Sequence, residues 1–81
     1  MADSKLFLKV LVDQFDEFDQ KNYRMDYKFK DDDNWDSLVA LSFIAAVDNE
    51  FSIKISGDDL SICETFTDFY NLFNEKKIKI F

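Results

Sequence analysis

The sequence has 81 residues, enough for one domain with a thin hydrophobic core. Hydrophobic residues make up 47% and charged residues 33%, a balance typical of a compact folded domain rather than a disordered segment. The formal net charge of -7 argues against nucleic acid as a partner, because phosphate binding requires clustered Lys and Arg.

The scarcity of histidine and cysteine removes the simplest designs of an enzyme or metal site. Histidine is absent, which removes the usual general base of Ser and Cys nucleophilic sites and the commonest zinc ligand. The single cysteine, Cys63, cannot form an internal disulfide, so a reducing, cytoplasmic setting fits. We interpret Cys63 as a small core residue. No secretory signal is evident, and no apolar run approaches the length of a membrane span.

Apolar residues at helical spacing predict the first element. Leu8, Leu11, Phe15 and Phe18 recur at intervals of three and four, so we expect a helix from about Ser4 to Phe18.

The next stretch, Asp19 to Asp36, is long, polar and without helical spacing, which predicts a loop. Tyr27 and Phe29 alternate as in a strand, but no partner strand is evident nearby. We interpret Trp35 as an anchor that packs this loop onto the body, with a partner contact as the alternative.

A second helix is predicted from Ser37 to about Asn49, with Asp36 as its N-cap. Its apolar residues at helical spacing are Leu38, Leu41, Ile44, Val47 and Phe51.

Capping signals predict two further helices. Ser56 and Asp59 have capping-box spacing, which indicates a short helix near Asp58 to Ile62, and Thr65 and Asp68 repeat the spacing at the start of a last helix. The apolar face of that helix holds Phe66, Phe69, Tyr70 and Phe73. Residues 76–81 are expected to form a tail or to dock back on the body. The order of elements predicts a single all-α domain over residues 1–81, a small four-helix bundle with a long loop between helices 1 and 2.

The segment Asp36-Ser37-Leu38 resembles the Asp-Ser-Leu motif of acyl carrier proteins. The surroundings are similar as well: a long loop precedes the motif, an apolar helix follows it and ends near Phe51, and Thr65 begins a final helix. The resemblance covers nearly the whole chain. It implies an acyl-carrier-like bundle that acts as a non-catalytic, monomeric carrier, with no metal site of its own.

The resemblance also implies roles for the motif residues. A phosphopantetheinyl transferase would attach phosphopantetheine from coenzyme A to Ser37, normally with a magnesium ion. The arm would hold its cargo as a thioester, in fatty-acid-like or specialised biosynthesis (polyketide, peptide or glycan-modifying). Acyl- or aminoacyl-loading and processing enzymes would be the further partners. In the family, Asp36 helps engage the transferase and its metal, and Leu38 packs inward behind the motif.

Residue chemistry supports Ser37 as an attachment point independently of the family. A serine in the first turn of a helix, after a long loop, is expected to be exposed at the positive end of the helix dipole. Without a histidine partner, Ser37 is a poor nucleophile by itself, which suits a residue that another enzyme modifies.

The helix after Ser37 departs from the fatty-acid carriers of the family, which usually present several acids there. Here acids come only near the helix end, which favours a carrier dedicated to one specialised pathway. The candidate partner contacts on this helix are Val39, Ser42, Ala45 and Asp48.

The sequence is also compatible with functions other than that of a carrier. The main alternative is an unmodified acidic helical domain that keeps the fold and binds other proteins. The acidic run Asp31 to Asp33 with Asp36 does not match an EF-hand, because that loop needs glycine at its sixth position and glutamate at its twelfth. Counted from Asp31, those positions hold Asp36 and Ser42.

Ten phenylalanines suggest a core with little room for cargo. The side chains expected to point inward are Phe15, Phe51, Phe66, Phe69 and Phe73, with Leu38, Leu41 and Ile44. A core of this kind predicts a short acyl, hydroxyacyl or aminoacyl cargo.

Overall fold

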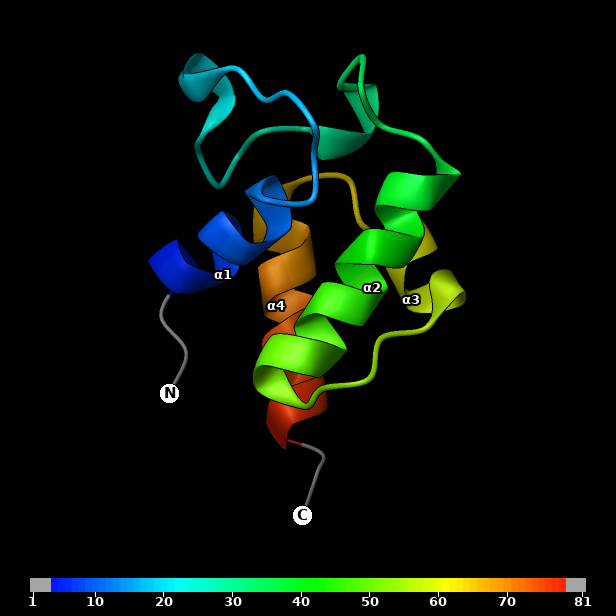
Figure 1. Cartoon of the computed structure of the whole chain (residues 1–81). Coiled ribbons are helices and arrows are strands. Elements are labelled where there is room, and N and C mark those ends of the chain that lie inside the picture. Colours follow the sequence, from blue (N-terminus) through cyan, green and yellow to red (C-terminus); the bar gives the residue numbers. More distant parts are fainter. Residues whose placement is uncertain (1–3, 79–81) are drawn as a thin grey trace.

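A computed structural model describes residues 4–78 and shows four α-helices joined by irregular segments (Figure 1). The helices are α1 (Ser4–Val12), α2 (Ser37–Phe51), α3 (Gly57–Ser61) and α4 (Phe66–Ile78). The described residues form no named strand, so the all-α class is confirmed. None of the described helices is long and apolar enough to cross a membrane.

Helix α1 ends at Val12, earlier than the predicted Phe18. The Asp13 amide still donates to a carbonyl four residues back, but the Gln14 and Phe15 amides donate to carbonyls only three residues back, which tightens and ends the helix. The turn carries Phe15 into the core, where its ring centroid lies 5.7 Å from that of Phe43. The predicted inward stripe is therefore confirmed for Leu8, Leu11 and Phe15, although the helix is shorter. Phe18 is only half-buried, and the fully buried Phe7 was not predicted.

The long segment between α1 and α2 contains no α-helix, as predicted, but it does contain two short 3-10 helices, Gln20–Asn22 and Phe29–Asp31. It arches over one end of the helices in Figure 1. Its middle is fastened to the start of α4, because the Thr67 amide and hydroxyl both donate to the Met25 carbonyl, at 2.8 and 2.9 Å. An isolated antiparallel bridge joins Lys28 to Thr65. The strand-like segment of Tyr27 and Phe29 therefore pairs with the residue just before α4.

Helix α2 runs two residues beyond the predicted Asn49 to Phe51 and is capped by Ser52, whose φ of 57° is left-handed. This left-handed cap redirects the chain so that Ile53 and Ile55 enter the core. Ser56 and Asp59 then form the predicted capping box at the start of α3, which begins and ends one residue before the predicted range.

Helix α4 begins after Thr65, whose hydroxyl accepts from the Asp68 amide at 3.1 Å while Asp68 accepts from the Thr65 amide. The predicted capping signal is thus confirmed, with Thr65 as the capping residue. Lys76 of α4 pairs with Asp59 of α3 at 3.0 Å and links the two helices. The expected tail at 76–81 is corrected in part: residues 76–78 continue α4, and 79–81 lie outside the described residues.

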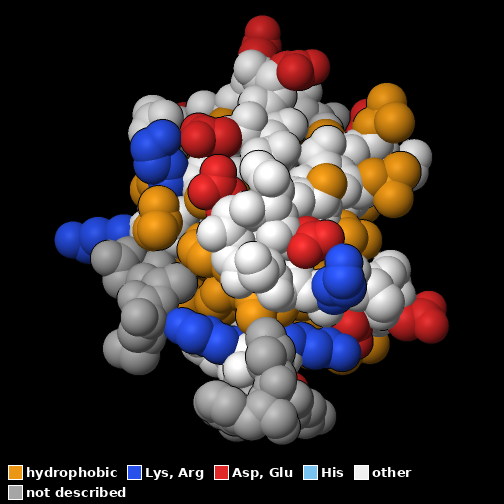
Figure 2. All heavy atoms as spheres, turned by 60° about the horizontal axis from the view of Figure 1, so that its bottom comes forward, with side chains coloured by type: hydrophobic (Ala, Val, Ile, Leu, Met, Phe, Trp, Pro, Cys, Tyr) orange, Lys and Arg blue, Asp and Glu red, His pale blue; other side chains and the backbone are white. Residues whose placement is uncertain are grey.

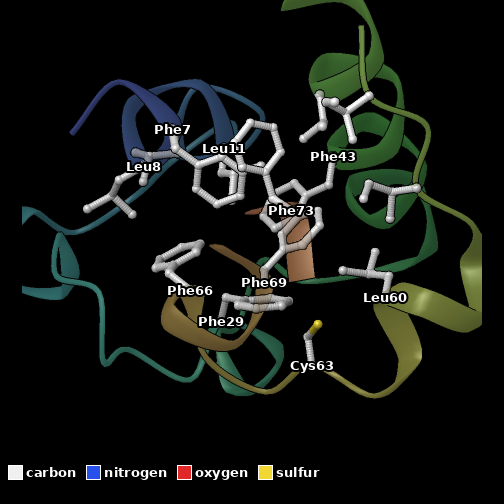
Figure 3. Close-up of a cluster of buried hydrophobic side chains, with 14 of the residues drawn as sticks. Phe7, Leu8, Leu11, Phe29, Phe43, Leu60, Cys63, Phe66, Phe69 and Phe73 are labelled. Atoms are coloured by element: carbon white, nitrogen blue, oxygen red, sulfur yellow. The ribbon is translucent and has the colours of Figure 1, made fainter. Parts of the chain in front are cut away.

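Phenylalanine rings from α1, the long loop, α2 and α4 meet in the core (Figure 3). The rings of Phe29 and Phe66 are stacked with centroids 5.2 Å apart, and those of Phe43 and Phe69 lie 6.0 Å apart. Cys63 is buried at the edge of the same cluster, which confirms it as a small core residue. The fully buried phenylalanines are Phe7, Phe29, Phe43, Phe66, Phe69 and Phe73.

The predicted inward face of α2 is wrong in part. Phe43 and Val47 are buried and Ile44 and Phe51 half-buried, but Leu38 and Leu41 are 71% and 63% exposed. The segment from Ser37 to Val47 has no charged residue, so several faces have helical apolar spacing. Packing selects the face of Phe43 because its ring fits among those of Phe15, Phe29 and Phe69.

Candidate functional site

Ser37 is the first residue of α2 and is exposed, as its sequence context predicted. Asp36 is extended and its carboxylate accepts from the Val39 amide at 2.9 Å, so the predicted N-cap is confirmed. The first backbone bond of the helix runs from the Ala40 amide to the Asp36 carbonyl, at 3.0 Å. The amides of Ser37 and Leu38 precede that bond, which leaves two N–H donors beside the Ser37 hydroxyl.

Trp35 holds the chain in place directly before the motif. Its ring is half-buried, with centroids 5.1 Å from those of both Phe29 and Phe43. The Trp35 amide donates to the Asp32 carbonyl at 3.0 Å, and the Asn34 side-chain amide donates to the Glu17 carbonyl at 3.0 Å. The interpretation of Trp35 as a loop anchor is therefore confirmed, and the anchor fixes where Ser37 is presented.

An uncharged surface follows Ser37 along α2. Leu38, expected from the resemblance to pack inward, points to solvent, and Leu41 lies one turn further on the same exposed side. Ile62, directly after α3, is 73% exposed. Figure 2 shows hydrophobic side chains gathered at one edge of the molecule, on the side where α2 and α3 lie. Sequence reasoning missed Leu41 and Ile62 as surface residues; the uncharged stretch of α2 was the signal available for Leu41.

The candidate partner contacts lie on the other side of α2. Ser42, Ala45 and Asp48 line an open groove that α2 forms with Val10 of α1, whereas Val39 lies nearer the helix start. Ala45 is exposed, and Val39, Ser42 and Asp48 are half-buried. Asp48 is paired with Lys54 at 3.2 Å.

A cleft of about 490 Å³ opens beside Ser37. Both sequence neighbours of Ser37 line it, and so does Trp35. The full lining is Gln14, Asp16, Asp33, Asn34, Trp35, Asp36, Leu38, Val39 and Ser42. The turn after α1, the end of the long loop and the first turns of α2 thus meet at one cavity. Gln14 and Asn34 were not singled out from the sequence, because nothing in their local context brings them near Ser37.

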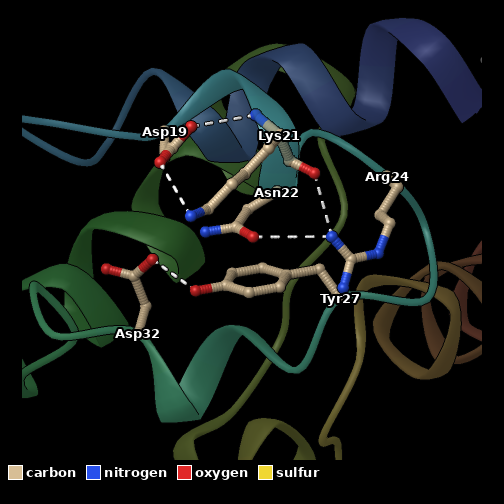
Figure 4. A network of polar contacts seen from close by, with 6 residues as sticks. All are labelled: Asp19, Lys21, Asn22, Arg24, Tyr27 and Asp32. Carbon is tan, nitrogen blue, oxygen red and sulfur yellow. Dashed lines mark hydrogen bonds and ion pairs between the residues drawn. The ribbon is translucent and has the colours of Figure 1, made fainter.

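The acidic loop before the motif contains one tightly held tyrosine (Figure 4). The Tyr27 hydroxyl donates to the Asp32 carboxylate at 2.5 Å, and the Arg24 guanidinium lies over the Tyr27 ring, 5.5 Å from its centroid. Burial raises the pKa of Tyr27 to about 12, helped by the hydrogen bond to Asp32 and the negative charges of Asp32 and Asp33, while Arg24 opposes the shift.

The described residues contain no group of three or more His, Cys, Asp or Glu side chains placed to hold a metal ion. Burial raises the pKa of the Cys63 thiol, so little of it is thiolate near neutral pH.

Comparison of the chain with protein-family models, curated proteins and solved structures gave no match.

Proposed function

We propose that this protein is an acyl-carrier-type protein that carries cargo as a thioester on phosphopantetheine attached to Ser37. The observation that carries the proposal is an exposed serine at the first position of a long helix, held there by an N-cap and an anchored loop. The helix order and the long first connection fit the acyl-carrier-like bundle that the Asp36-Ser37-Leu38 motif implies.

The residues at Ser37 fit a phosphodiester. No hydrogen bond engages the Ser37 hydroxyl within residues 4–78, so the hydroxyl is open to a modifying enzyme. The free amides of Ser37 and Leu38 can donate to phosphate oxygens, and the positive end of the α2 dipole favours an anion at this point. When attached, the arm supplies the thiol on which cargo is carried.

Loading requires a partner enzyme because the sequence has no histidine to activate the Ser37 hydroxyl. The Ser37 oxygen forms a bond to the pantetheine-side phosphorus of coenzyme A as the pyrophosphate bond breaks. The hydroxyl proton passes to a base on the transferase, and the adenosine bisphosphate half of coenzyme A departs. One carboxylate oxygen of Asp36 accepts a hydrogen bond from the Val39 amide, so the other oxygen can face the transferase and its magnesium ion.

The surface around Ser37 suits a partner with an apolar centre and a basic rim. Leu38 and Leu41 provide exposed apolar area, while Asp33 precedes the motif and Asp58 lies in the first turn of α3. A net charge of -7 would steer basic partner surfaces toward the molecule.

The direct test is intact-mass measurement after incubation with coenzyme A and a broad-specificity phosphopantetheinyl transferase. We expect a gain of one phosphopantetheine on the native chain and none on Ser37→Ala. Ser61→Ala is a matched control, since Ser61 is also an exposed helical serine, and it should load normally. Absence of loading with several transferases would leave the unmodified protein-binding domain as the better description.

A further inference from the structure

The cleft beside Ser37 is large enough for a small ligand and is placed at the proposed attachment point. Its volume of about 490 Å³ lies within the roughly 300–1,000 Å³ typical of ligand sites. Asp36 and Leu38 both line its rim, so a group attached to Ser37 begins at the mouth of the cleft. The core offers less space for a ligand, because its phenylalanine rings are fully buried against one another.

Polar side chains in the cleft have fixed orientations that leave acceptors available. The Gln14 amide nitrogen donates to the Val10 carbonyl at 3.0 Å, and the Asn34 amide nitrogen donates to the Glu17 carbonyl at 3.0 Å. The structure gives neither side-chain carbonyl oxygen a donor, and both residues line the cleft. These oxygens can accept from the amide N–H groups of a pantetheine chain, while Trp35 offers an apolar wall.

The charges in the cleft restrict what else can enter. Asp16 and Asp33 line it without an ion pair or hydrogen bond to another described residue, and Asp36 uses its carboxylate as a helix cap. Among the described residues, no lysine or arginine lines the cleft. A terminal carboxylate would be repelled there, whereas a neutral or ammonium group would not.

We propose that the cleft formed by Gln14, Asn34, Trp35 and the first turns of α2 receives the pantetheine chain and a short neutral or cationic cargo. This inference rests on the proposed function, because it needs a group attached to Ser37. The pantetheine arm would then lie on the α1 side of α2 rather than on the exposed surface of Leu41 or in the core.

The experiment uses a coenzyme A analogue with a nitroxide spin label on its thiol, loaded enzymatically onto Ser37. Loss of NMR signal from nearby protons then reports the position of the arm. We expect the strongest loss at the Trp35 indole N–H and the Gln14 side-chain amide, and weak loss at Ile62. Gln14→Ala should reduce the signal loss at Trp35. Asn71→Ala, at an exposed position of α4, should not.

Two outcomes would overturn the inference, and each is distinct from failure of the carrier proposal. Complete loading with the strongest signal loss at Leu41 and Ile62 would place the arm on the opposite surface. Complete loading with uniform weak loss would show an arm that occupies no site. Failure to load at all would instead contradict the proposed function, and intact mass separates that case.

Cargo charge is tested on the same loaded protein without a spin label. A β-aminoacyl cargo should shift the Trp35 indole and Gln14 side-chain signals, and a malonyl cargo should shift them less. The double substitution Asp16→Asn with Asp33→Asn should reduce the difference, with Asp36 as the remaining carboxylate of the cleft. Equal shifts for both cargoes in the native chain would refute the charge selection.

Discussion

Tyr27 has a pKa well above that of a free tyrosine side chain because of its surroundings in the fold. Its hydroxyl is tied to Asp32, its ring lies under Arg24, and the backbone carbonyl of Tyr27 accepts from the Phe66 amide at 3.3 Å. The Tyr27 side chain therefore holds the acidic loop together, while its backbone carbonyl joins that loop to the start of α4. The protonation state of Tyr27 affects stability because only the protonated hydroxyl can donate to Asp32.

We predict that Tyr27 makes stability fall at high pH. The folded pKa of about 12 lies above the ordinary value of 10.0, so the folded state holds the proton more tightly than the unfolded chain. The resulting stabilisation is fully present below about pH 10 and is lost as the pH rises toward about 12. Urea unfolding across this range should show the decline in the native chain and less of it in Tyr27→Phe. A decline of equal size in both proteins would assign it to other groups.

Helix α2 combines a core face with an exposed apolar face. Phe43 and Val47 hold it on the body, whereas Leu38 and Leu41 contribute little to the core. The exposed leucines are thus available for function at small cost to folding, and their unfavourable contact with water gives a partner protein apolar area to cover.

Paired substitutions should separate these faces. Phe43→Ala removes a fully buried ring and should lower the free energy of unfolding by about 3–5 kcal/mol. Leu41→Asn should change it by no more than about 0.5 kcal/mol, as is usual at exposed sites. Leu41→Asn should nevertheless slow transferase loading of Ser37. A large loss of stability in Leu41→Asn would mean that Leu41 packs against the body, contrary to its exposure.

At the scale of the whole molecule, negative charge is in excess and concentrated near the motif. Asp31, Asp33 and Asp36 form no ion pair with another described residue. Like charges in this region repel, and added salt screens exposed charges over a Debye length of about 8–10 Å.

We predict that the melting temperature rises with added salt or magnesium. Asp33→Asn should raise the melting temperature at low salt and have less effect at high salt. Glu64→Gln is a control for net charge alone, because Glu64 is an exposed acid in the α3–α4 connection, and it should have a smaller effect. A melting temperature indifferent to both additives would show that the repulsion is insignificant.

The filled core bears on cargo length. Of the side chains expected to leave little room, Phe66, Phe69 and Phe73 are fully buried, and Phe15 is buried. Opening such a core costs about 1–3 kcal/mol, while each buried CH₂ of a chain returns roughly 0.8 kcal/mol. A short cargo would therefore gain too little to enter.

Acyl groups of increasing length on Ser37 provide the test. We expect thermal stability and thioester hydrolysis to change little over short chains. If neither quantity changes steadily with acyl length, the core stays closed to the acyl chain. Stability and protection that rise steadily with each added carbon would show that the core opens, and the prediction of a short cargo would be wrong.

Local chemistry in the sequence determined the caps and the composition of the core. Asp36, Ser56 and Thr65 cap helices as predicted, because a cap needs only a side-chain oxygen and the amides two or three residues ahead. The inward stripe of α1 and the phenylalanine face of α4 were also predicted, since charged or polar neighbours mark the opposite faces.

Only the tertiary structure decided which side of α2 faces the core and what lies beside Ser37. Leu38 and Phe43 are both apolar on an uncharged helix, so helical spacing alone does not choose between them; ring packing from α1, the loop and α4 does. The cleft likewise joins Gln14 to Asn34 and Ser42 across three segments. Such long-range proximity depends on how the segments pack together, and local residue patterns do not encode it.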